Sequence, residues 1–293
     1  MKPSQEGQTF PEVRFEAVGK SWDLTVTPLV MGILNRTPDS FYDKGSYFAF
    51  DEFLRKAETL VAEGADIVDI GGVKAGPGPE VSEAEELERV VPAVEAVARR
   101  FGVQISVDTW NAQVLDASLS SGAHIGNDIS GFADPKYLEV AARHRAAVVA
   151  THIRLSPRIK DPEPIYDDLL GEVEEFLVER VRRARQAGVR EHAIAIDAGF
   201  DLGKTTEQSL ELFANTDRLA TFGPAVLISA SNKGFLGEIL ELEVTDRRAA
   251  SLSAVALSYL SGARIFRVHD VRGTRRVLDT LTAISDPERF QNA

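Results

Sequence analysis

Short apolar runs, each followed by a stretch with helical spacing, recur along the chain and constrain its fold more than any other feature. The first run lies within residues 29–43, where LVMGIL leads into Asn35 and then into polar, turn-forming residues. A short run rich in Val, Ile and Leu is typical of a strand buried on both faces, as in a parallel sheet. Because the strand–helix unit repeats eight times, the sequence predicts a closed (β/α)8 TIM barrel.

The element boundaries follow from apolar periodicity and from capping and turn residues. The expected strands are 28–35, 65–71, 103–108, 124–128, 146–152, 193–197, 225–231 and 264–268. The expected helices are 50–63, 82–101, 111–121, 135–144, 168–187, 206–215, 245–261 and 271–284. A doubly wound open sheet is the alternative, but no strand is followed by a Gly-x-Gly-x-x-Gly turn.

Residues ahead of the barrel predict a separate small element. Alternating apolar and polar residues over 13–26 predict an N-terminal β-hairpin that covers one end of the main fold. The polar residues 1–9 are expected to be disordered. We therefore predict one TIM-barrel domain over 1–293.

The composition excludes several classes of function. A net charge of −12 argues against a surface for nucleic acid or anionic membranes. The absence of cysteine removes disulfides, thiolate metal sites and cysteine nucleophiles. We find no secretion signal and no apolar run long enough to span a membrane, so a cytoplasmic location is expected.

Polar residues follow every expected strand, at the end where such barrels place their chemistry. They are Asn35, Asp69, Asp108, Asn127 with Asp128, His152, Asp197, Ser231 with Lys233, and Arg267 with His269. Helix capping accounts for a few acids in such positions, and Asp69 and Asp128 fit that interpretation. Capping does not explain polar residues at all eight ends, so we predict a functional site there.

The residue types at this site suggest a nitrogen-rich ring and an anion as ligands. Asp108, Asn127 and Asp197 can pair with the N–H and carbonyl groups of such a ring. Positive charge and donors for an anion come from Lys233, Arg267 and His269, with Lys204 as a further candidate. Asn35 offers an oxygen to Mg²⁺, although an isolated asparagine is also an ordinary turn residue. No Gly-x-Ser-x-Gly motif supports a hydrolase.

Seven motifs together resemble one known family. MGILNRTPDSF, DIGG, SVDT, NDISG, DAGFDLGK, SNK and RVHDV occur in this order at successive strand ends. From Leu29 to the last helix the chain resembles dihydropteroate synthase, a family of TIM barrels that are usually homodimers. The resemblance implies condensation of 6-hydroxymethyl-7,8-dihydropterin diphosphate with 4-aminobenzoate, assisted by Mg²⁺. Diphosphate would leave before the aryl amine attacks.

The resemblance also implies a role for each matching residue. Asp108, Asn127, Asp197, Lys233 and Arg267 would bind the pterin. Asn35 would bind the metal beside the diphosphate, and Arg267 and His269 would hold the leaving anion. The catalytic set would then be Asn35, Lys233, Arg267 and His269.

The sequence departs from the family's pattern in the loops. After DIGG the family has E-S-T-R-P-G, where this chain has Val73-Lys74-Ala75-Gly76-Pro77-Gly78. A hydroxyl and an arginine are therefore absent, and Lys74 would be a substitute charge for the diphosphate. The family's S-R-K-S becomes Ser231-Asn232-Lys233-Gly234, which loses an arginine and the hydroxyl that serves the aminobenzoate carboxylate. This pattern resembles the divergent second copy of the synthase in some bacteria, which is poor or inactive in the standard reaction.

Three hypotheses remain open at this point. The first is a family member that binds pterin but has weak or no synthase activity. The second is an active synthase in which Lys74 and Arg36 supply the missing charge. The third is a barrel that binds a pterin or folate for another reaction, such as methyl transfer. The MGILN-x-TPDSF loop argues against the third, since it is a synthase feature.

Overall fold

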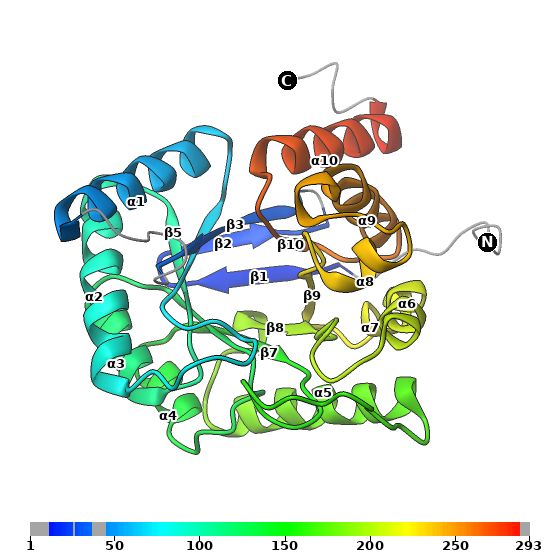
Figure 1. Cartoon of the computed structure of the whole chain (residues 1–293), viewed down its shortest axis with the longest axis horizontal. Coiled ribbons are helices and arrows are strands. Elements are labelled where there is room, and N and C mark those ends of the chain that lie inside the picture. The colour runs from blue at the N-terminus through cyan, green and yellow to red at the C-terminus, as the bar shows by residue number, and fades with distance from the viewer. Residues whose placement is uncertain (1–11, 26, 37–44, 288–293) are drawn as a thin grey trace.

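The computed structural model describes residues 12–25, 27–36 and 45–287. Eight parallel strands close into a barrel in the order β10-β3-β4-β5-β6-β7-β8-β9, and helices surround it (Figure 1). The barrel strands are β3 (Leu29–Asn35), β4 (Ile67–Gly71), β5 (Gln104–Asp108), β6 (Ile125–Asp128), β7 (Ala147–Thr151), β8 (Ile194–Asp197), β9 (Ala225–Ile228) and β10 (Ile265–Val268). The predicted TIM barrel is confirmed.

Helices follow the strands in sequence. They are α1 (Gly45–Ala62), α2 (Glu83–Arg100), α3 (Ala112–Ser120), α4 (Tyr137–Arg143), α5 (Leu169–Gln186), α6 (Thr206–Ala214), α7 (Thr216–Leu219), α8 (Gly234–Glu238), α9 (Arg248–Leu260) and α10 (Val271–Ser285), with 3₁₀ turns η2 (Glu191–Ala193) and η3 (Val244–Asp246). Side-chain caps open several of them; Ser82, for example, caps α2 and accepts from the Glu85 N–H. The residues expected to be disordered, 1–9, lie outside the described part.

The predicted hairpin is present at the N-terminus. β1 (Arg14–Ala17) pairs antiparallel with β2 (Lys20–Asp23), and Phe15 and Trp22 stack with ring centroids 5.9 Å apart. Phe15 is fully buried, and Glu16 forms a 2.7 Å ion pair with Arg190, which precedes β8. The hairpin therefore packs against the amino ends of the barrel strands, opposite the predicted site.

Several boundary predictions were wrong. The helix expected at 50–63 is α1, which begins at Gly45. β9 ends at Ile228 rather than at residue 231, so Ser231 and Lys233 lie in the turn that follows it. The helix expected at 245–261 is divided into η3 and α9. The short helices α7 and α8 were not predicted, because four or five residues are too few to show helical periodicity.

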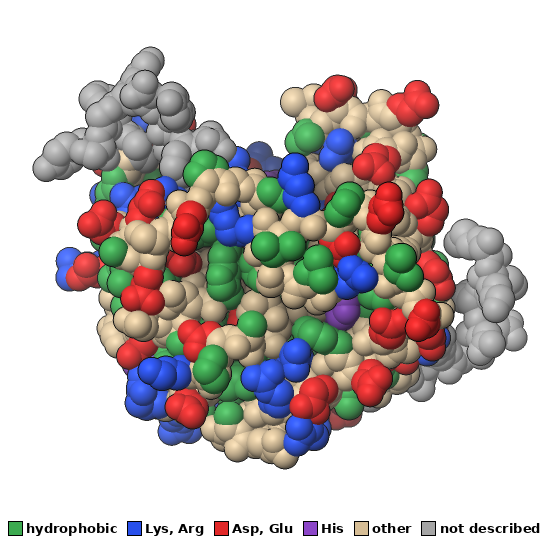
Figure 2. All heavy atoms as spheres, turned by 60° about the horizontal axis from the view of Figure 1, so that its bottom comes forward, with side chains coloured by type: hydrophobic (Ala, Val, Ile, Leu, Met, Phe, Trp, Pro, Cys, Tyr) green, Lys and Arg blue, Asp and Glu red, His purple; other side chains and the backbone are tan. Residues whose placement is uncertain are grey.

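Charged side chains of both signs are interspersed over the face shown in Figure 2. Such mixing agrees with an acidic chain that has no extended basic surface on that face. In the described residues, no helix is long and apolar enough to cross a membrane.

Candidate active site

Strand register brings several predicted site residues to one level at the carboxyl ends of the strands. Asn35 is opposite Gly71, Gly71 is opposite Asp108, and Asp108 is opposite Asn127. A Cβ added to Gly71 would lie 3.2 Å from Asn35 Oδ1 and 3.3 Å from Asp108 Cβ. Glycine at this point therefore lets the Asn35 and Asp108 side chains approach each other from the two neighbouring strands.

Arg267 ties the acids of this level together. Its Nε lies 2.6 Å from Asp69 Oδ2, and its Nη2 lies 2.7 Å from Asp108 Oδ2. Asn127 Nδ2 donates to the same Asp69 oxygen at 3.3 Å. One guanidinium from β10 thus links β4 and β5 across the barrel interior.

Asp69 has a different role from the one predicted. It was interpreted as a helix cap, but it lies two residues before the end of β4, is fully buried and pairs with Arg267. Its second oxygen, Oδ1, has no hydrogen-bond partner. The alternation of side chains along a strand could have indicated this, because Asp69 and Gly71 are two residues apart and therefore face the same side of β4. Asp128 does cap its own loop, accepting from the Ser130 and Phe132 N–H groups.

Burial and charge set the protonation of this cluster. Burial raises the pKa of Asp108 to about 7, although the charge of Arg267 opposes the rise. Burial alone would lower the pKa of Arg267, but Asp69 and Asp108 more than offset it and hold that pKa above its ordinary value. The cluster therefore has a permanent cation and a carboxyl group that can hold a proton near neutral pH.

Asp197 and Lys233 form the second part of the site. Asp197, at the end of β8, is buried, and its Oδ1 accepts the Gly199 N–H at 2.8 Å. Lys233 is the N-cap residue of α8 and donates to the Phe200 carbonyl. Burial raises the pKa of Asp197 and lowers that of Lys233, while the attraction between their charges opposes both shifts. The Asp197 and Lys233 charges thus lie close enough to affect each other's pKa.

Lys204 holds a loop instead of facing the mouth. Its Nζ donates to the Gly199 and Leu202 carbonyls at 2.9 and 3.2 Å and lies 2.8 Å from His152 Nδ1. Burial, together with the nearby Lys233 charge, lowers the pKa of Lys204 to about 7. The interpretation of Lys204 as an anion ligand is therefore replaced by a structural role.

His269 lies exposed after β10 and pairs with Ser231. Ser231 Oγ is 3.0 Å from His269 Nδ1 and accepts the His269 N–H at 3.2 Å. This double contact fixes the turn after β9 against the turn after β10, and it leaves the imidazole at the rim of the mouth.

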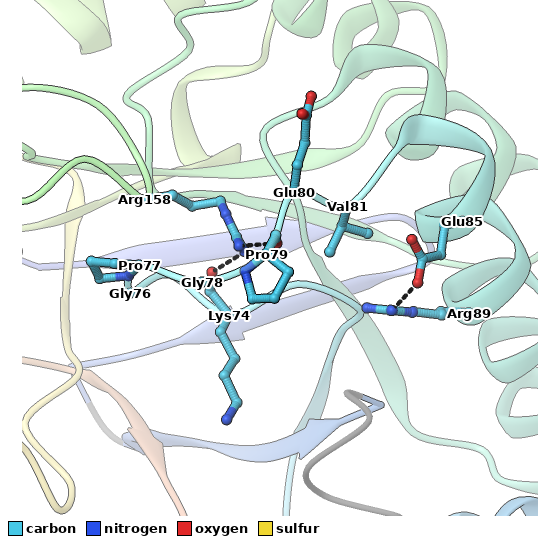
Figure 3. Close-up of a pocket in the computed structure, with 10 residues that line it drawn as sticks. All are labelled: Lys74, Gly76, Pro77, Gly78, Pro79, Glu80, Val81, Glu85, Arg89 and Arg158. Atoms are coloured by element: carbon cyan, nitrogen blue, oxygen red, sulfur yellow. Dashed lines mark hydrogen bonds and ion pairs between the residues drawn. The ribbon is translucent and has the colours of Figure 1, made fainter.

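The loop between β4 and α2 carries the main departures from the family pattern, and a second loop is attached to it. Arg158, from the loop after β7, donates through its side chain to the Lys74 carbonyl at 3.3 Å and to the Pro79 carbonyl (Figure 3). The Arg158 N–H donates to the Ala75 carbonyl at 3.1 Å. β5 and β6 lie between β4 and β7 in the barrel. The joined loops therefore connect the two sides of the part of the mouth that holds Asp108 and Asn127.

A cavity of about 290 Å³ lies along this loop, and Lys74, Arg89 and Arg158 contribute cations to it. In Figure 3 the Lys74 side chain extends away from Arg158, on the opposite side of the loop. Arg89 is paired with Glu85 and also donates to the Gly72 carbonyl. Arg158 was not predicted, because its partners are backbone carbonyls distant in sequence.

Arg36 does not point along the strand ends. Its guanidinium donates to the Arg89 carbonyl of α2 and lies 4.9 Å from the centre of the Phe50 ring. Its charge is thus directed to α2, which leaves Lys74 as the candidate to replace the missing charge of the β4–α2 loop.

Asn35 remains the candidate metal ligand. In the described residues, no group of three or more His, Asp or Glu side chains could hold a metal. Mg²⁺ is commonly bound by one or two protein oxygens together with water and substrate phosphates. The oxygen of Asn35 fits that mode of binding but not a cage made by protein side chains alone.

Comparison with known proteins gives consistent matches over nearly the whole chain. A family model described as pterin binding enzyme matches residues 31–269. The dihydropteroate synthase of Escherichia coli K12 is 38% identical over 279 residues, which are 94% of this chain and 99% of the relative. The inactive dihydropteroate synthase 2 of Mycobacterium leprae is 41% identical over 262 residues, 87% of this chain and 90% of the relative. The structure of Xanthomonas albilineans dihydropteroate synthase with 4-aminobenzoic acid gives a TM-score of 0.87 at 36% identity, covering 94% of this chain and 99% of the other.

Proposed function

Because the chain belongs to the dihydropteroate synthase family of pterin-binding enzymes, we propose that it binds a pterin at the barrel mouth with weak or no synthase turnover. The observation that carries this proposal is a set of buried and partly buried polar groups at and just beyond the strand ends. Its members accept and donate hydrogen bonds in the directions that a flat, nitrogen-rich ring requires. They are Asp108, Asn127, Asp197, Lys233 and Arg267.

In the proposed binding mode the ring lies across the mouth with its N–H groups toward carboxylates. Asp197 and Asp108 accept ring N–H groups, and the Asn127 amide forms hydrogen bonds with a neighbouring edge of the ring. Lys233 donates to a ring acceptor, and Arg267 lies against the ring while it holds Asp108 in place. All of these groups except Lys233 lie in barrel strands and are already held in place, which reduces the entropy lost on binding.

In the synthase reaction, a C–N bond forms between the amine nitrogen and the pterin methylene carbon. The C–O bond to diphosphate breaks, diphosphate keeps the electron pair, and the amine loses a proton. Asn35 would hold Mg²⁺ together with the diphosphate oxygens, and the bound ion would supply charge to the departing anion. Lys74, Arg267 and His269 would add positive charge or donors there.

The β4–α2 loop supports weak turnover. Ala75 and Gly76 offer neither a hydroxyl nor a guanidinium to the departing diphosphate, and Arg36 is engaged by α2. Loss of one donor from a developing anion costs about 2.7–4 kcal/mol, or roughly 10²–10³ in rate. The inactive M. leprae relative, at 41% identity, agrees with this interpretation.

We also propose a homodimer built on the C-terminal helices, in the cytoplasm. Large apolar side chains are exposed on or beside α8, α9 and α10. They are Ile239, Leu240, Val244, Leu257, Leu260 and Ile284. Exposed apolar groups gathered in one region are typical of a partner surface. Sedimentation of the wild type and of Leu260→Glu tests this, with a shift from dimer to monomer expected in the variant.

Calorimetry with a pterin analogue tests the binding proposal. We expect saturable binding to the wild type and at least a 100-fold loss in Asp197→Ala, because a ring N–H would then face a buried site with no acceptor. Asp116→Ala, which changes an exposed carboxylate, is the control and should bind normally. Absence of binding to the wild type, or equal binding to Asp197→Ala, would contradict the proposal.

Turnover distinguishes the proposed function from an active synthase. Diphosphate release is measured with both substrates and Mg²⁺, beside the E. coli relative under the same conditions. We expect a rate at least 100-fold below the relative. A rate within tenfold of the relative would instead favour an active synthase.

A further inference from the structure

Three residues of the loop between β8 and α6 have left-handed backbone: Gly199 (φ 68°), Asp201 (φ 64°) and Gly203 (φ 66°). A Cβ at position 199 would lie 1.8 Å from the His152 carbonyl oxygen, and one at position 203 would lie 2.7 Å from Arg154 Cβ. Glycine is therefore required at two of these positions. The backbone of Asp201 has a conformation that favours glycine. Aspartate is strained there, so its carboxylate is present at a cost in backbone energy.

The Asp201 carboxylate is held at a defined place. Its Oδ2 accepts the Gly234 N–H at 2.7 Å, and the Asp201 N–H donates to Ser209 Oγ at 3.2 Å. Gly234 begins α8, next to the site residue Lys233. A carboxylate of the protein itself thus occupies the first N–H of α8, and a carboxylate on a ligand cannot take the same donor.

A hollow joins Asp201 to the rim of the mouth. It is formed by the loops after β4, β7 and β8, and its apolar lining comes from Ile153, Leu155, Ile159 and Leu202. Its charged residues are Asp201, Asp161 and Arg158.

Neither of the other two charged residues is paired with Asp201. Asp161 forms a 2.7 Å ion pair with Arg154, and the Arg158 guanidinium donates to backbone carbonyls. Among the described residues, no cation lies within ion-pair distance of Asp201, although Lys204 and Lys233 are affected by its charge from the barrel side. The hollow therefore combines apolar walls with a carboxylate that forms no ion pair with the described cations, Arg158 of the same lining included.

We propose that Asp201 determines the charge of the amine that this barrel accepts as its second substrate. The accepted class is an amine with an apolar body whose far end is neutral or cationic, and an amine carrying a carboxylate is disfavoured. The inference rests on the proposed function, because it concerns the nucleophile for the same pterin methylene. Bond formation, loss of diphosphate and loss of the amine proton are unchanged, and only the identity of the amine differs.

The test compares two amines of similar shape and different charge, 4-aminobenzoate and 4-aminobenzamide. Their affinities are measured by calorimetry for the full chain, alone and saturated with the pterin analogue. We expect the wild type to bind the amide at least tenfold more tightly than the acid. In Asp201→Gly, we expect affinity for the acid to rise at least tenfold, because the carboxylate is removed and the Gly234 N–H is released.

Glu241→Gly is the matched control. Glu241 also has a left-handed backbone (φ 52°) and a negative charge, but it is exposed and does not line the hollow. Its substitution should leave the ratio of the two affinities unchanged. Asp201→Gly places glycine where the backbone favours it, so the variant should fold, and circular dichroism checks this.

The outcomes separate the two proposals. Pterin binding with an unchanged amine ratio in Asp201→Gly would overturn only the role of Asp201. Preference of the wild type for the acid, or no binding of either amine to either protein, would also overturn it. Loss of pterin binding with the predicted amine ratio retained would instead contradict the proposed function.

Discussion

The floor of the barrel mouth and the loops above it hold their polar groups in different ways. In the floor, Asp69, Asp108 and Asn127 are fixed by strand register and joined by Arg267. In the loops, Arg158 and Asp201 are held by contacts with backbone groups of other loops. A change in the floor disturbs the barrel itself, whereas a loop can change its residues while the barrel keeps its shape. The motifs that resemble the family accordingly include the floor, and the departures from its pattern lie in the loops.

Removal of the floor's central cation should have the largest effect. Arg267→Leu leaves Asp69 and Asp108 buried without a cation, and such a loss costs about 3–5 kcal/mol of unfolding free energy at pH 7. The deficit should shrink at lower pH, because both carboxyl groups can then take up protons. Urea unfolding at several pH values measures it.

The control for this change is a surface ion pair. Arg143→Leu breaks the pair with Asp116, in which both side chains are largely exposed. It should cost about 1 kcal/mol or less. Equal losses in the two variants would contradict a floor held together by Arg267.

Restoring the loop chemistry should have the next largest effect. Ala75→Thr combined with Gly76→Arg returns a hydroxyl and a guanidinium to the β4–α2 loop. A Cβ at position 76 would meet no atom within 4 Å, so a side chain can begin there without a clash. If the loop limits turnover, diphosphate release should rise about 10²–10³-fold.

Gly102→Arg is the matched control for the added arginine. Position 102 is equally open, but it lies between α2 and β5, at the amino ends of the strands. Its diphosphate release should equal that of the wild type. No gain from the double variant would show that the loop residues are not what limits the reaction.

Sequence alone predicted most of the floor, Asp69 excepted, and was insufficient for the loops. The recurrence of strand and helix predicted the barrel, and polar residues after each strand predicted where Asp108, Asn127 and Asp197 would gather. Neighbouring strands pair in a regular register, so the position of a residue in one strand fixes which residue lies beside it in the next strand. The partners of Arg158 and Asp201 are backbone groups of distant loops, and residue type gives no signal for such contacts. Asp69 was misassigned because its charge partner, Arg267, is 198 residues away.

The floor should also give a distinct pH dependence. Burial raises the pKa of Asp108 from its ordinary value to about 7, so the folded state binds this proton more tightly than the unfolded chain. Its contribution to unfolding free energy is therefore present below about pH 4 and is lost as pH rises to about 7. In Asp108→Asn, the unfolding free energy should fall less over that range, by about 1–3 kcal/mol.

Asp116→Asn is the control for the titration. The His144 and Arg143 contacts lower the pKa of Asp116, so this group titrates below the range in question. Its variant should keep the wild-type slope between pH 4 and pH 7. The same slope in Asp108→Asn would show that Asp108 is fully ionised in the folded protein throughout that range.

The smallest expected effect is confined to the loops. Arg158→Ala removes the side-chain donors to the Lys74 and Pro79 carbonyls and leaves the backbone bond to Ala75 in place. Each lost bond is worth about 0.5–1.5 kcal/mol, so hydrogen exchange across 74–79 should accelerate about 10-fold while β5 and β6 stay protected. Arg99→Ala, which breaks an exposed pair on α2, should leave this loop unchanged. If β5 and β6 also lose protection, then the loops and the floor are one cooperative unit, because a floor held by register and Arg267 alone would not respond to a loop contact.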